Sequence, residues 1–381
     1  MELLKSTQHS MTKSCVLARH GLSVETNGAL LPCCQFSGRP QDGHKSYTIR
    51  DYPEWRVEMD SLAVDLDAGI EDPRCRQCWH DENLGYDSLR TTSNKRHGIA
   101  DNTDPWHVEF KLGNFCNLRC IMCSPYSSSS IWSEFIQNKA EYNSVGVNWS
   151  VASGEHKWWD SDAFKEFYLK VLPTVTYLHF TGGEPFMVPG LGDILHSVAH
   201  PERVRLLFVT NMTIINDNIL LLLNKFKSVD FAISLEGVGK HNDYVRYGSN
   251  FSDIEANLKK LKNIIKENLC INVNHTFQHT SIYSLPALID WCHDQNFNIH
   301  FSLLGGEDYM RINSVPPADM SRFKDQIEQS LTIKPDVKSY VLNVIKDYQY
   351  DSDLNDKFRR YTNMIDGIRG NNYNLTFDPA N

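Results

Sequence analysis

Short apolar runs rich in β-branched residues recur along the chain from about residue 105, and segments of helical length separate them. Six runs are long enough for strands: Trp106–Leu112, Thr176–Thr181, Arg203–Thr210, Val229–Leu235, Leu269–Phe277 and Asn298–Leu304. Strands that alternate with helices in this way build a parallel sheet. Six such units predict an incomplete TIM-like barrel, (β/α)6, in place of the closed eightfold one.

Amphipathic segments between the strands predict the helices of these units. The predicted helices are Ser127–Asn138, Leu191–Ala199, Asp217–Phe226, Asp253–Glu267 and Leu285–His293. A segment at 139–160 is an insertion between the first two strands, and we expect its tryptophans to pack on the outside of the domain. After Gly306 the pattern turns polar and helical, with helices predicted at Pro317–Ser330, Val337–Ile345 and Asp353–Ile365.

Residues 1–100 do not show the alternation of strands and helices that follows residue 105. They are rich in turn residues, show no sustained helical or strand period, and carry five of the ten cysteines. We therefore expect an α/β protein of three parts. Residues 1–100 form a small cysteine-rich module, 105–306 the partial barrel and 307–381 a helical extension.

Composition narrows the class of protein. The chain has 381 residues, of which 41% are hydrophobic, so it can bury a sizeable core. Lys+Arg number 38 against 47 Asp+Glu, and this acidic balance tells against nucleic acid as a partner. No run approaches the roughly 18 apolar residues of a membrane span, and the first residues lack the apolar core of a secretion signal. We therefore expect a cytoplasmic protein, in which cysteines serve as metal ligands or catalytic thiols more often than as disulfides.

Three cysteines follow the first predicted barrel strand. Cys116, Cys120 and Cys123 have the spacing C-x3-C-x2-C within one loop. Iron–sulfur clusters are held by cysteine thiolates, commonly four for a cubane, so a set of three leaves one iron open to a ligand that is not protein. Buried thiols or a zinc site are the alternative interpretation.

A glycine pair and a carboxylate follow the second predicted strand, in the sequence YLHFTGGEPF. Gly182 and Gly183 let the backbone approach a ligand closely, and Glu184 beside them can receive a cationic amine. Alone, this segment would be an ordinary turn. One strand after the three cysteines, it indicates a ligand site at the carboxyl ends of the strands.

Together, these motifs resemble those of the radical S-adenosylmethionine (SAM) enzymes, whose hallmark is C-x3-C-x2-C after the first strand of a partial barrel. The resemblance implies that Cys116, Cys120 and Cys123 hold a 4Fe-4S cluster. It implies that SAM chelates the fourth iron and that reduction cleaves SAM to a 5′-deoxyadenosyl radical, which abstracts hydrogen. It also implies that the GGE element binds the methionine amino group. One departure is Met122, where the family usually has an aromatic residue.

Polar residues at the next strand ends fit the same family order. Asn211 follows the third strand, Ser234 ends the fourth, and Arg246 comes shortly after it. Relatives of this kind use a polar residue at the end of the fourth strand and a following arginine against the ribose and carboxylate of SAM. The resemblance therefore implies SAM contacts for Ser234 and Arg246, and Asn211 is a further candidate.

Five more cysteines precede the barrel, and four of them are candidate metal ligands. Cys15 and Cys33 lie in a C-x12-G-x4-C pattern, and Cys75 and Cys78 form a C-x2-C pair. Four thiolates suffice for a tetrahedral zinc or for a second 4Fe-4S cluster. The first pattern resembles the start of SPASM and twitch domains, which carry an auxiliary cluster in radical SAM enzymes, although in most members that module follows the barrel. We expect the auxiliary cluster, with zinc as the alternative. Cys34 beside Cys33 is expected to point elsewhere.

The resemblance leaves the substrate open. Members with auxiliary clusters often modify peptides or proteins, whereas others act on nucleotides, sugars or small metabolites. We expect a peptide or protein substrate, and an electron donor such as flavodoxin or ferredoxin. A protein of another class, which keeps the fold and merely binds iron–sulfur or zinc, is the remaining alternative, and the GGE element argues against it.

Overall fold

The computed structural model describes residues 13–37, 45–97, 105–149 and 156–377. The chain folds into two compact units that are both discontinuous in sequence. Unit 1 comprises 1–111 and 158–179, and unit 2 comprises 112–157 and 180–381. The division predicted from the sequence, into 1–100, 105–306 and 307–381, stays a prediction.

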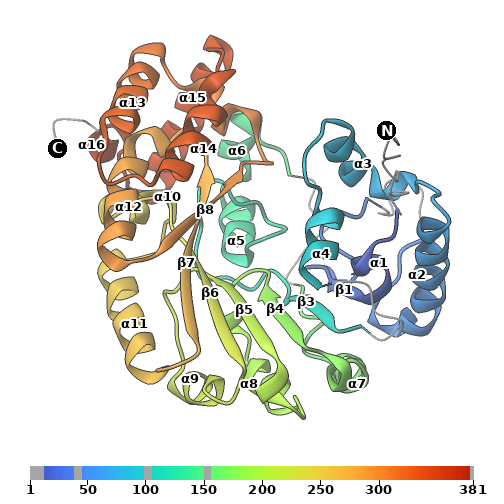
Figure 1. The fold of residues 1–381 in the computed structure, drawn as a ribbon. Helices are drawn as coiled ribbons and strands as arrows, with labels where there is room; N and C mark the ends of the chain where they lie inside the picture. Colours follow the sequence, from blue (N-terminus) through green and yellow to red (C-terminus); the bar gives the residue numbers. More distant parts are fainter. Residues whose placement is uncertain (1–12, 38–44, 98–104, 150–155, 378–381) are drawn as a thin grey trace, which may run out of the picture. The chain divides into compact units, whose positions relative to one another are not determined.

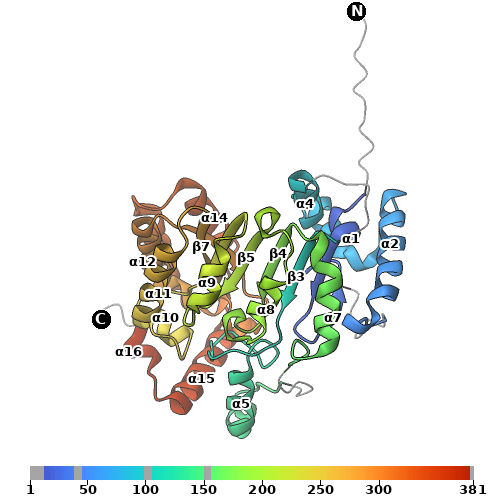
Figure 2. The ribbon, with the colours of Figure 1, turned by 90° about the horizontal axis from the view of Figure 1, so that it is seen from below.

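Unit 1 combines a small sheet with helices, whose course can be followed in Figure 1. Its elements are α1 (Val16–His20), β1 (Gly21–Val24), β2 (Leu30–Leu31), α2 (Tyr52–Asp67), α3 (Arg76–Asn83), α4 (Leu89–His97), β3 (His107–Lys111) and α7 (Asp162–Val171). Strand β4 (Tyr177–Thr181) begins in this unit. In Figures 1 and 2, α1 lies between β1 and α2.

Strands of unit 1 follow the order β2-β1-β3-β4. Strand β1 pairs antiparallel with β2 and parallel with β3, where Ser23 lies opposite Glu109. The connection between β1 and β2 contains Gly28 with φ +84°, a left-handed conformation that favours glycine. The pattern C-x12-G-x4-C therefore folds as a hairpin that extends the sheet beside β3. Strands β3 and β4 confirm the first two predicted strands within one residue.

The expectation that residues 1–100 lack sustained helical structure is wrong. Helix α2 has 16 residues and buries Trp55, Met59, Leu62 and Leu66. These positions recur at intervals of three and four residues, which is the period of an amphipathic helix. The sequence thus contains the apolar period of α2, which the turn-rich segment before the helix made difficult to recognise.

Unit 2 contains the remaining strands and helices. They are α5 (Ser129–Gln137), α6 (Lys139–Ser144), α8 (Leu191–His196), β5 (Arg205–Thr210), α9 (Asp217–Leu223), β6 (Ser228–Ser234), α10 (Lys240–Val245), α11 (Phe251–Ile264), β7 (Leu269–Phe277), α12 (Ser281–Gln295), β8 (Asn298–Leu303), α13 (Pro317–Gln329), α14 (Pro335–Lys346), α15 (Ser352–Arg369) and α16 (Tyr373–Phe377). Helix α12 contains Pro286 and begins earlier than predicted.

Strands β5 to β8 form parallel ladders in the order of the chain. Their inward positions are apolar, and the rings of Phe180, Phe208 and Phe231 stack at centroid distances of 5.2 and 5.4 Å. The four predicted strands from Arg203 onward are confirmed to within two residues. Alternate residues of β5, β6 and β7 are buried, and these apolar positions produce the hydrophobic pattern from which the strands were predicted.

Helices follow the strands as expected for consecutive βα units. Helices α11 and α12 lie along the flank of β5 to β8, and α13 to α16 gather at one end of unit 2 (Figures 1 and 2). The expected α/β fold with a partial-barrel core and a helical C-terminal region is confirmed. In the insertion, the partly buried Trp149 packs on the core residues Phe135 and Tyr142, whereas 150–155 lie outside the described residues.

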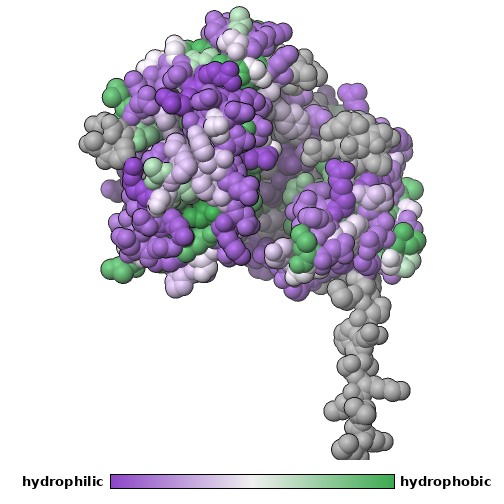
Figure 3. All heavy atoms as spheres, turned by 90° about the horizontal axis from the view of Figure 1, so that it is seen from above, coloured by the Kyte–Doolittle hydropathy of each residue, from purple (hydrophilic) through white to green (hydrophobic). Residues whose placement is uncertain are grey.

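None of the helices in the described ranges combines the length and the apolar character that crossing a membrane requires. Figure 3 shows one face of the molecule, on which hydrophilic residues predominate and hydrophobic residues are scattered.

Candidate functional site

The loop that carries Cys116, Cys120 and Cys123 is held by serines at the start of α5. Ser128 caps the helix by accepting a hydrogen bond from the Ile131 N–H, and its hydroxyl donates to the Leu118 carbonyl at 2.7 Å. The Ser130 hydroxyl donates to the Cys116 carbonyl at 2.6 Å. Small hydroxyl side chains reach the backbone at short range, so the serine run following the cysteines fixes the loop to the helix.

The three thiols interact with one another. Cys116 and Cys120 are buried, and the Cys123 thiol shares a hydrogen bond with Cys120. That hydrogen bond lowers the pKa of Cys120, with Arg246 contributing, and raises the pKa of Cys123. Burial, together with the neighbouring Cys120, raises the pKa of Cys116 to about 12.

These residues supply a donor set that fits an iron–sulfur cluster. Thiolates are the ligands of such clusters, and three of them lie in one eight-residue segment from Cys116 to Cys123. Within the described ranges, no three Cys, His, Asp or Glu side chains already stand as ligands around one point. The sulfur atoms instead form hydrogen bonds with protein donors and with each other.

The GGE segment lies directly against the cysteine loop. The Gly183 N–H donates to the Gly113 carbonyl at 2.9 Å, and the Glu184 N–H donates to the Phe115 carbonyl at 2.8 Å. A Cβ atom on Gly183 would stand 2.3 Å from the Phe115 oxygen, so only glycine permits this approach. Gly182 has φ +114°. Gly183 thus allows the backbones of the two loops to approach each other. The sequence had predicted such a close approach between the backbone and a ligand.

Glu184 is buried and connects its loop to the end of β5. Its carboxylate accepts hydrogen bonds from the Thr210 hydroxyl at 2.7 Å, the Asn211 N–H at 2.7 Å and the Phe186 N–H at 3.1 Å. Burial raises the pKa of Glu184 to about 7, against the opposing effect of these hydrogen bonds. In this arrangement Glu184 positions Asn211 and the GGE loop.

Asn211 stands beside the first cysteine. Its amide nitrogen donates to the Asn117 side-chain oxygen at 3.0 Å and lies 3.9 Å from the Cys116 sulfur. Its side-chain oxygen accepts from the Thr213 N–H at 2.9 Å and hydroxyl at 2.6 Å. The structure therefore brings Asn211 to the cysteine loop.

Arg246 reaches the second cysteine. One terminal nitrogen donates to the Cys120 sulfur at 3.8 Å, and the other donates to Glu236 at 2.8 Å. The Arg246 Nε–H is buried without a partner. An unpaired buried donor is costly, so this guanidinium retains capacity to bind an anionic group.

Glu236 is a residue whose role the sequence analysis missed. It is fully buried, and besides Arg246 it accepts the Thr276 N–H at 3.0 Å and lies 3.3 Å from His275 Nδ1. Its place two residues after the end of β6 and ten residues before Arg246 was the available signal. Ser234, by contrast, ends β6 without a hydrogen bond from its hydroxyl to any described residue, and the structure does not link it to the cysteines.

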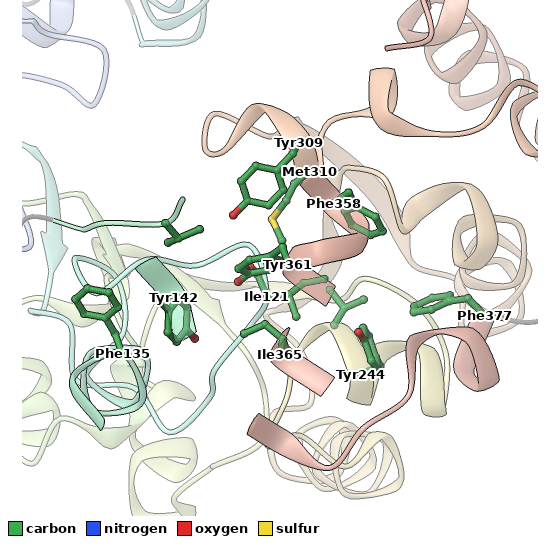
Figure 4. Packing of buried hydrophobic residues seen from close by; sticks show 12 residues of the cluster. Ile121, Phe135, Tyr142, Tyr244, Tyr309, Met310, Phe358, Tyr361, Ile365 and Phe377 are labelled. Atoms are coloured by element: carbon green, nitrogen blue, oxygen red, sulfur yellow. The ribbon is translucent and has the colours of Figure 1, made fainter. Parts of the chain in front are cut away.

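The C-terminal helices also support the cysteine loop, which the sequence did not reveal. The Tyr361 hydroxyl of α15 donates to the Ile121 carbonyl at 3.0 Å. Arg369 donates to Glu134 of α5 at 2.7 Å, and both side chains are at most 1% exposed. Figure 4 shows Ile121 among aromatic and aliphatic side chains from the loop, α5, α6, α10 and the C-terminal segments.

Unit 1 brings the other four cysteines together. Cys33 interacts electrostatically with Cys15 and Cys75, and Cys75 also interacts with Cys78. Burial is the largest cause that raises the pKa of all four thiols, to about 11 for Cys15 and about 12 for Cys75. Four clustered thiols fit a closed four-ligand site.

The other cysteines lie apart from these sets. Cys34 is exposed, and its main electrostatic partners are Glu109 and Lys111. Cys33, by contrast, interacts with Cys15 and Cys75 as well as with Cys34. Cys292 is buried and Cys270 is exposed.

The comparisons with known proteins agree with the motifs. Residues 110–280 match the family model of the radical SAM superfamily. The matched segment contains the cysteine loop, the GGE segment and Arg246, and members of that superfamily are enzymes. None of the curated proteins compared matches the sequence.

Three similar solved structures can be named. Native anSMEcpe with bound AdoMet is 13% identical, with a TM-score of 0.41, and the match covers 64% of this chain and 62% of that one. SuiB of Streptococcus suis bound to S-adenosylmethionine is 15% identical, with a TM-score of 0.37 and coverage of 79% and 60%. SuiB bound to its precursor peptide SuiA is 14% identical, with a TM-score of 0.36 and coverage of 93% and 78%. The chain thus spans less than two thirds of the first two structures.

Proposed function

We propose that this protein is a radical SAM enzyme that cleaves SAM reductively and takes hydrogen from its substrate. The observation that carries the proposal is the junction of two loops in unit 2. There the backbone of the GGE segment is hydrogen-bonded to the loop of Cys116, Cys120 and Cys123. A site that only stores metal has no need for this neighbour, whereas a site that binds SAM against a cluster does.

The three cysteines would hold a 4Fe-4S cluster, and SAM would complete its coordination. When bound, the cluster and SAM supply a one-electron cleavage that yields a 5′-deoxyadenosyl radical. The residues of the chain would bind SAM and orient it. Arg246, whose Nε–H lacks a partner, would receive the carboxylate of SAM, while Glu236 holds the guanidinium in place.

Asn211 and the GGE loop would position the remainder of SAM. Asn211 presents its amide beside Cys116, and Glu184 fixes the Asn211 backbone by accepting its N–H. Gly182, with φ +114°, and Gly183, which is hydrogen-bonded to the cysteine loop, lie at the same junction, and we retain both as candidate backbone contacts of SAM. We retain Ser234 as a candidate contact at the end of the fourth barrel strand.

We further propose that Cys15, Cys33, Cys75 and Cys78 hold a second 4Fe-4S cluster in a twitch-like N-terminal module. Four thiolates would leave no iron open, so this cluster would conduct electrons or shape the unit instead of binding substrate. Zinc is the alternative occupant, because the same four thiols complete a tetrahedral site.

The substrate proposed is a peptide or protein, as is common among radical SAM enzymes with auxiliary clusters. The reductant proposed is a flavodoxin or ferredoxin. The acidic balance of the chain, with a net charge of -9, disfavours nucleic acid as the substrate.

SAM cleavage tests the proposal directly. The protein would be reconstituted with iron and sulfide under anaerobic conditions, reduced with dithionite and assayed for 5′-deoxyadenosine. Wild type should release it and Cys116→Ala should not. The control variant Cys270→Ala, which removes an exposed thiol outside both sets, should retain the activity. Absence of 5′-deoxyadenosine from a fully loaded wild-type protein would reject the function.

A further inference from the structure

A polar network covers one face of the sheet in unit 1. Residues His107, Glu109 and Lys111 alternate along β3, so they share one face, and His179 lies on β4. Ser23 on β1 lies opposite Glu109 in the parallel register. The intervening residues, such as Val108 and Phe110, are buried, and Phe110 packs edge-on against Phe164 of α7.

The groups of this network are joined to one another. The Ser23 hydroxyl donates to Glu109 at 3.0 Å, and His179 Nδ1 lies 3.4 Å from the other oxygen of Glu109. Lys111 donates to Glu25 at 2.5 Å. The side chains of Glu25 and Glu109 are 10% and 12% exposed, which places them mostly out of solvent.

The charges in this network do not balance. Glu25 and Glu109 are two carboxylates, whereas Lys111 is the one ammonium that pairs with either of them among the described residues. Burial lowers the pKa of His179, so its imidazole is neutral at neutral pH and supplies no second cation. A carboxylate withdrawn from water requires a positive partner.

A second observation points to a ligand at the same place. The Nε2 atom of His179 is buried and has no hydrogen-bond partner. A neutral imidazole that turns its Nδ1–H toward Glu109 presents Nε2 as an acceptor. A buried acceptor without a partner can take a hydrogen bond from the donor of a ligand. Glu109 and His179 together thus offer negative charge and a free acceptor to a group that donates N–H bonds.

We propose that this face of unit 1 binds an organic cation, the ammonium of a lysine or the guanidinium of an arginine in a peptide. Glu109 and His179 would receive the N–H donors, and Ser23 would keep Glu109 in place. Glu25 would keep the Lys111 ammonium in an ion pair, so that Glu109 is available to the bound cation. Such a site selects peptides with a basic side chain. It depends on neither cluster, so it stands or falls independently of the proposed radical chemistry.

The test is calorimetric titration of the full-length protein, without SAM or reductant, with Nα-acetyl-lysine amide and Nα-acetyl-arginine amide. The neutral Nα-acetyl-norleucine amide is the matched control ligand. We expect at least one cationic probe to bind with a millimolar dissociation constant and the neutral probe not to bind. Glu109→Gln should weaken binding about tenfold, the loss expected for one charge-assisted hydrogen bond.

Lys111→Met provides a test of opposite sign. It removes the competing ammonium, so the cationic probe should bind more tightly, by about threefold to tenfold. General destabilisation cannot tighten binding, and the variant therefore keeps the test valid if Glu109→Gln fails to fold. Glu71→Gln, at an exposed ion pair with Lys13, should change nothing. Equal binding of the neutral probe, no binding of either cation, or weaker binding by Lys111→Met would overturn the proposal.

Discussion

The two cysteine sets differ in what surrounds their thiols. Beside the three-cysteine loop of unit 2, Arg246 donates to the Cys120 sulfur and keeps an unpartnered Nε–H. In unit 1, Arg90, which interacts electrostatically with Cys15 and Cys78, pairs with Glu82 and donates to the Ser14 carbonyl. The arginine beside the first set therefore keeps a free N–H donor, whereas Arg90 beside the second set is held by protein acceptors.

This difference separates an open site from a closed one. Three thiols leave a ligand position free, and the free donor of Arg246 stands where an anionic ligand could use it. Four thiols satisfy a metal site by themselves. The comparison predicts that catalysis depends on unit 2 and that the module in unit 1 has a supporting role.

The largest expected effect comes from removing each set separately. Alanine at Cys116, Cys120 and Cys123 should remove about four irons, and alanine at Cys15, Cys33, Cys75 and Cys78 should remove about four others. The first change should abolish SAM cleavage and the second should leave it. Iron and sulfide analysis with a 5′-deoxyadenosine assay measures both. Loss of SAM cleavage in both variants at full folding would erase the distinction between the sites.

Gly183→Ala should damage the open site alone. The added Cβ would meet the Phe115 carbonyl oxygen at 2.3 Å and push the GGE segment away from the cysteine loop. We expect a cost of about 1–3 kcal/mol in unfolding free energy and loss of most iron from the loop, with the four-cysteine iron retained. Gly190→Ala is the control, since nothing lies within 4 Å of its Cβ position. Equal iron content in both variants would contradict the tight junction.

Arg369→Met tests whether the C-terminal helix supports the loop. It removes the bidentate partner of the buried Glu134, which keeps Arg119 at 3.1 Å, so the cost should not exceed the about 3–5 kcal/mol of a fully broken buried pair. Urea unfolding should show this loss, and the double variant with Glu134→Leu should recover part of it. Arg322→Met, at an exposed ion pair, should change stability by no more than about 1 kcal/mol. Equal effects of both arginine variants would argue against the buried support.

The last expected effect concerns the dependence of stability on pH. Burial lowers the pKa of His279 to about 3, and its ring stacks on Phe358 at 3.6 Å. Between about pH 6.5 and 3 the unfolded chain therefore binds a proton that the folded protein does not, so stability falls as pH falls, by up to about 1.4 kcal/mol per pH unit. His279→Gln should flatten this acid slope of unfolding free energy, whereas the exposed His200→Gln should not. Identical slopes in both variants would show that His279 is not the group responsible.

Much of the fold could be predicted, because its parallel strands leave long apolar runs in the sequence. All six predicted barrel strands occur within about two residues of the expected positions. Helix α2 was missed although Trp55, Met59, Leu62 and Leu66 carry its period. The strands β1 and β2 are only four and two residues long, too short for a periodic signal.

The candidate site was predictable where a motif carries it and hidden where tertiary packing creates it. The cysteine spacing and GGEP marked the two loops that the structure joins. Glu134 and Arg369 are 235 residues apart, and no local pattern relates them. The same holds for Tyr361, whose hydroxyl reaches the cysteine loop from the C-terminal helix. Contacts of this kind follow from the fold and not from local sequence.

The most direct measurement is electron paramagnetic resonance of the reduced variant that lacks Cys15, Cys33, Cys75 and Cys78, with and without SAM. Only the cysteine loop of unit 2 can then hold a cluster. We predict the signal of one reduced 4Fe-4S cluster that shifts when SAM is added, because SAM would bind its open iron. A cluster signal that SAM leaves unchanged, or no cluster after anaerobic reconstitution, would contradict the assignment of Cys116, Cys120 and Cys123.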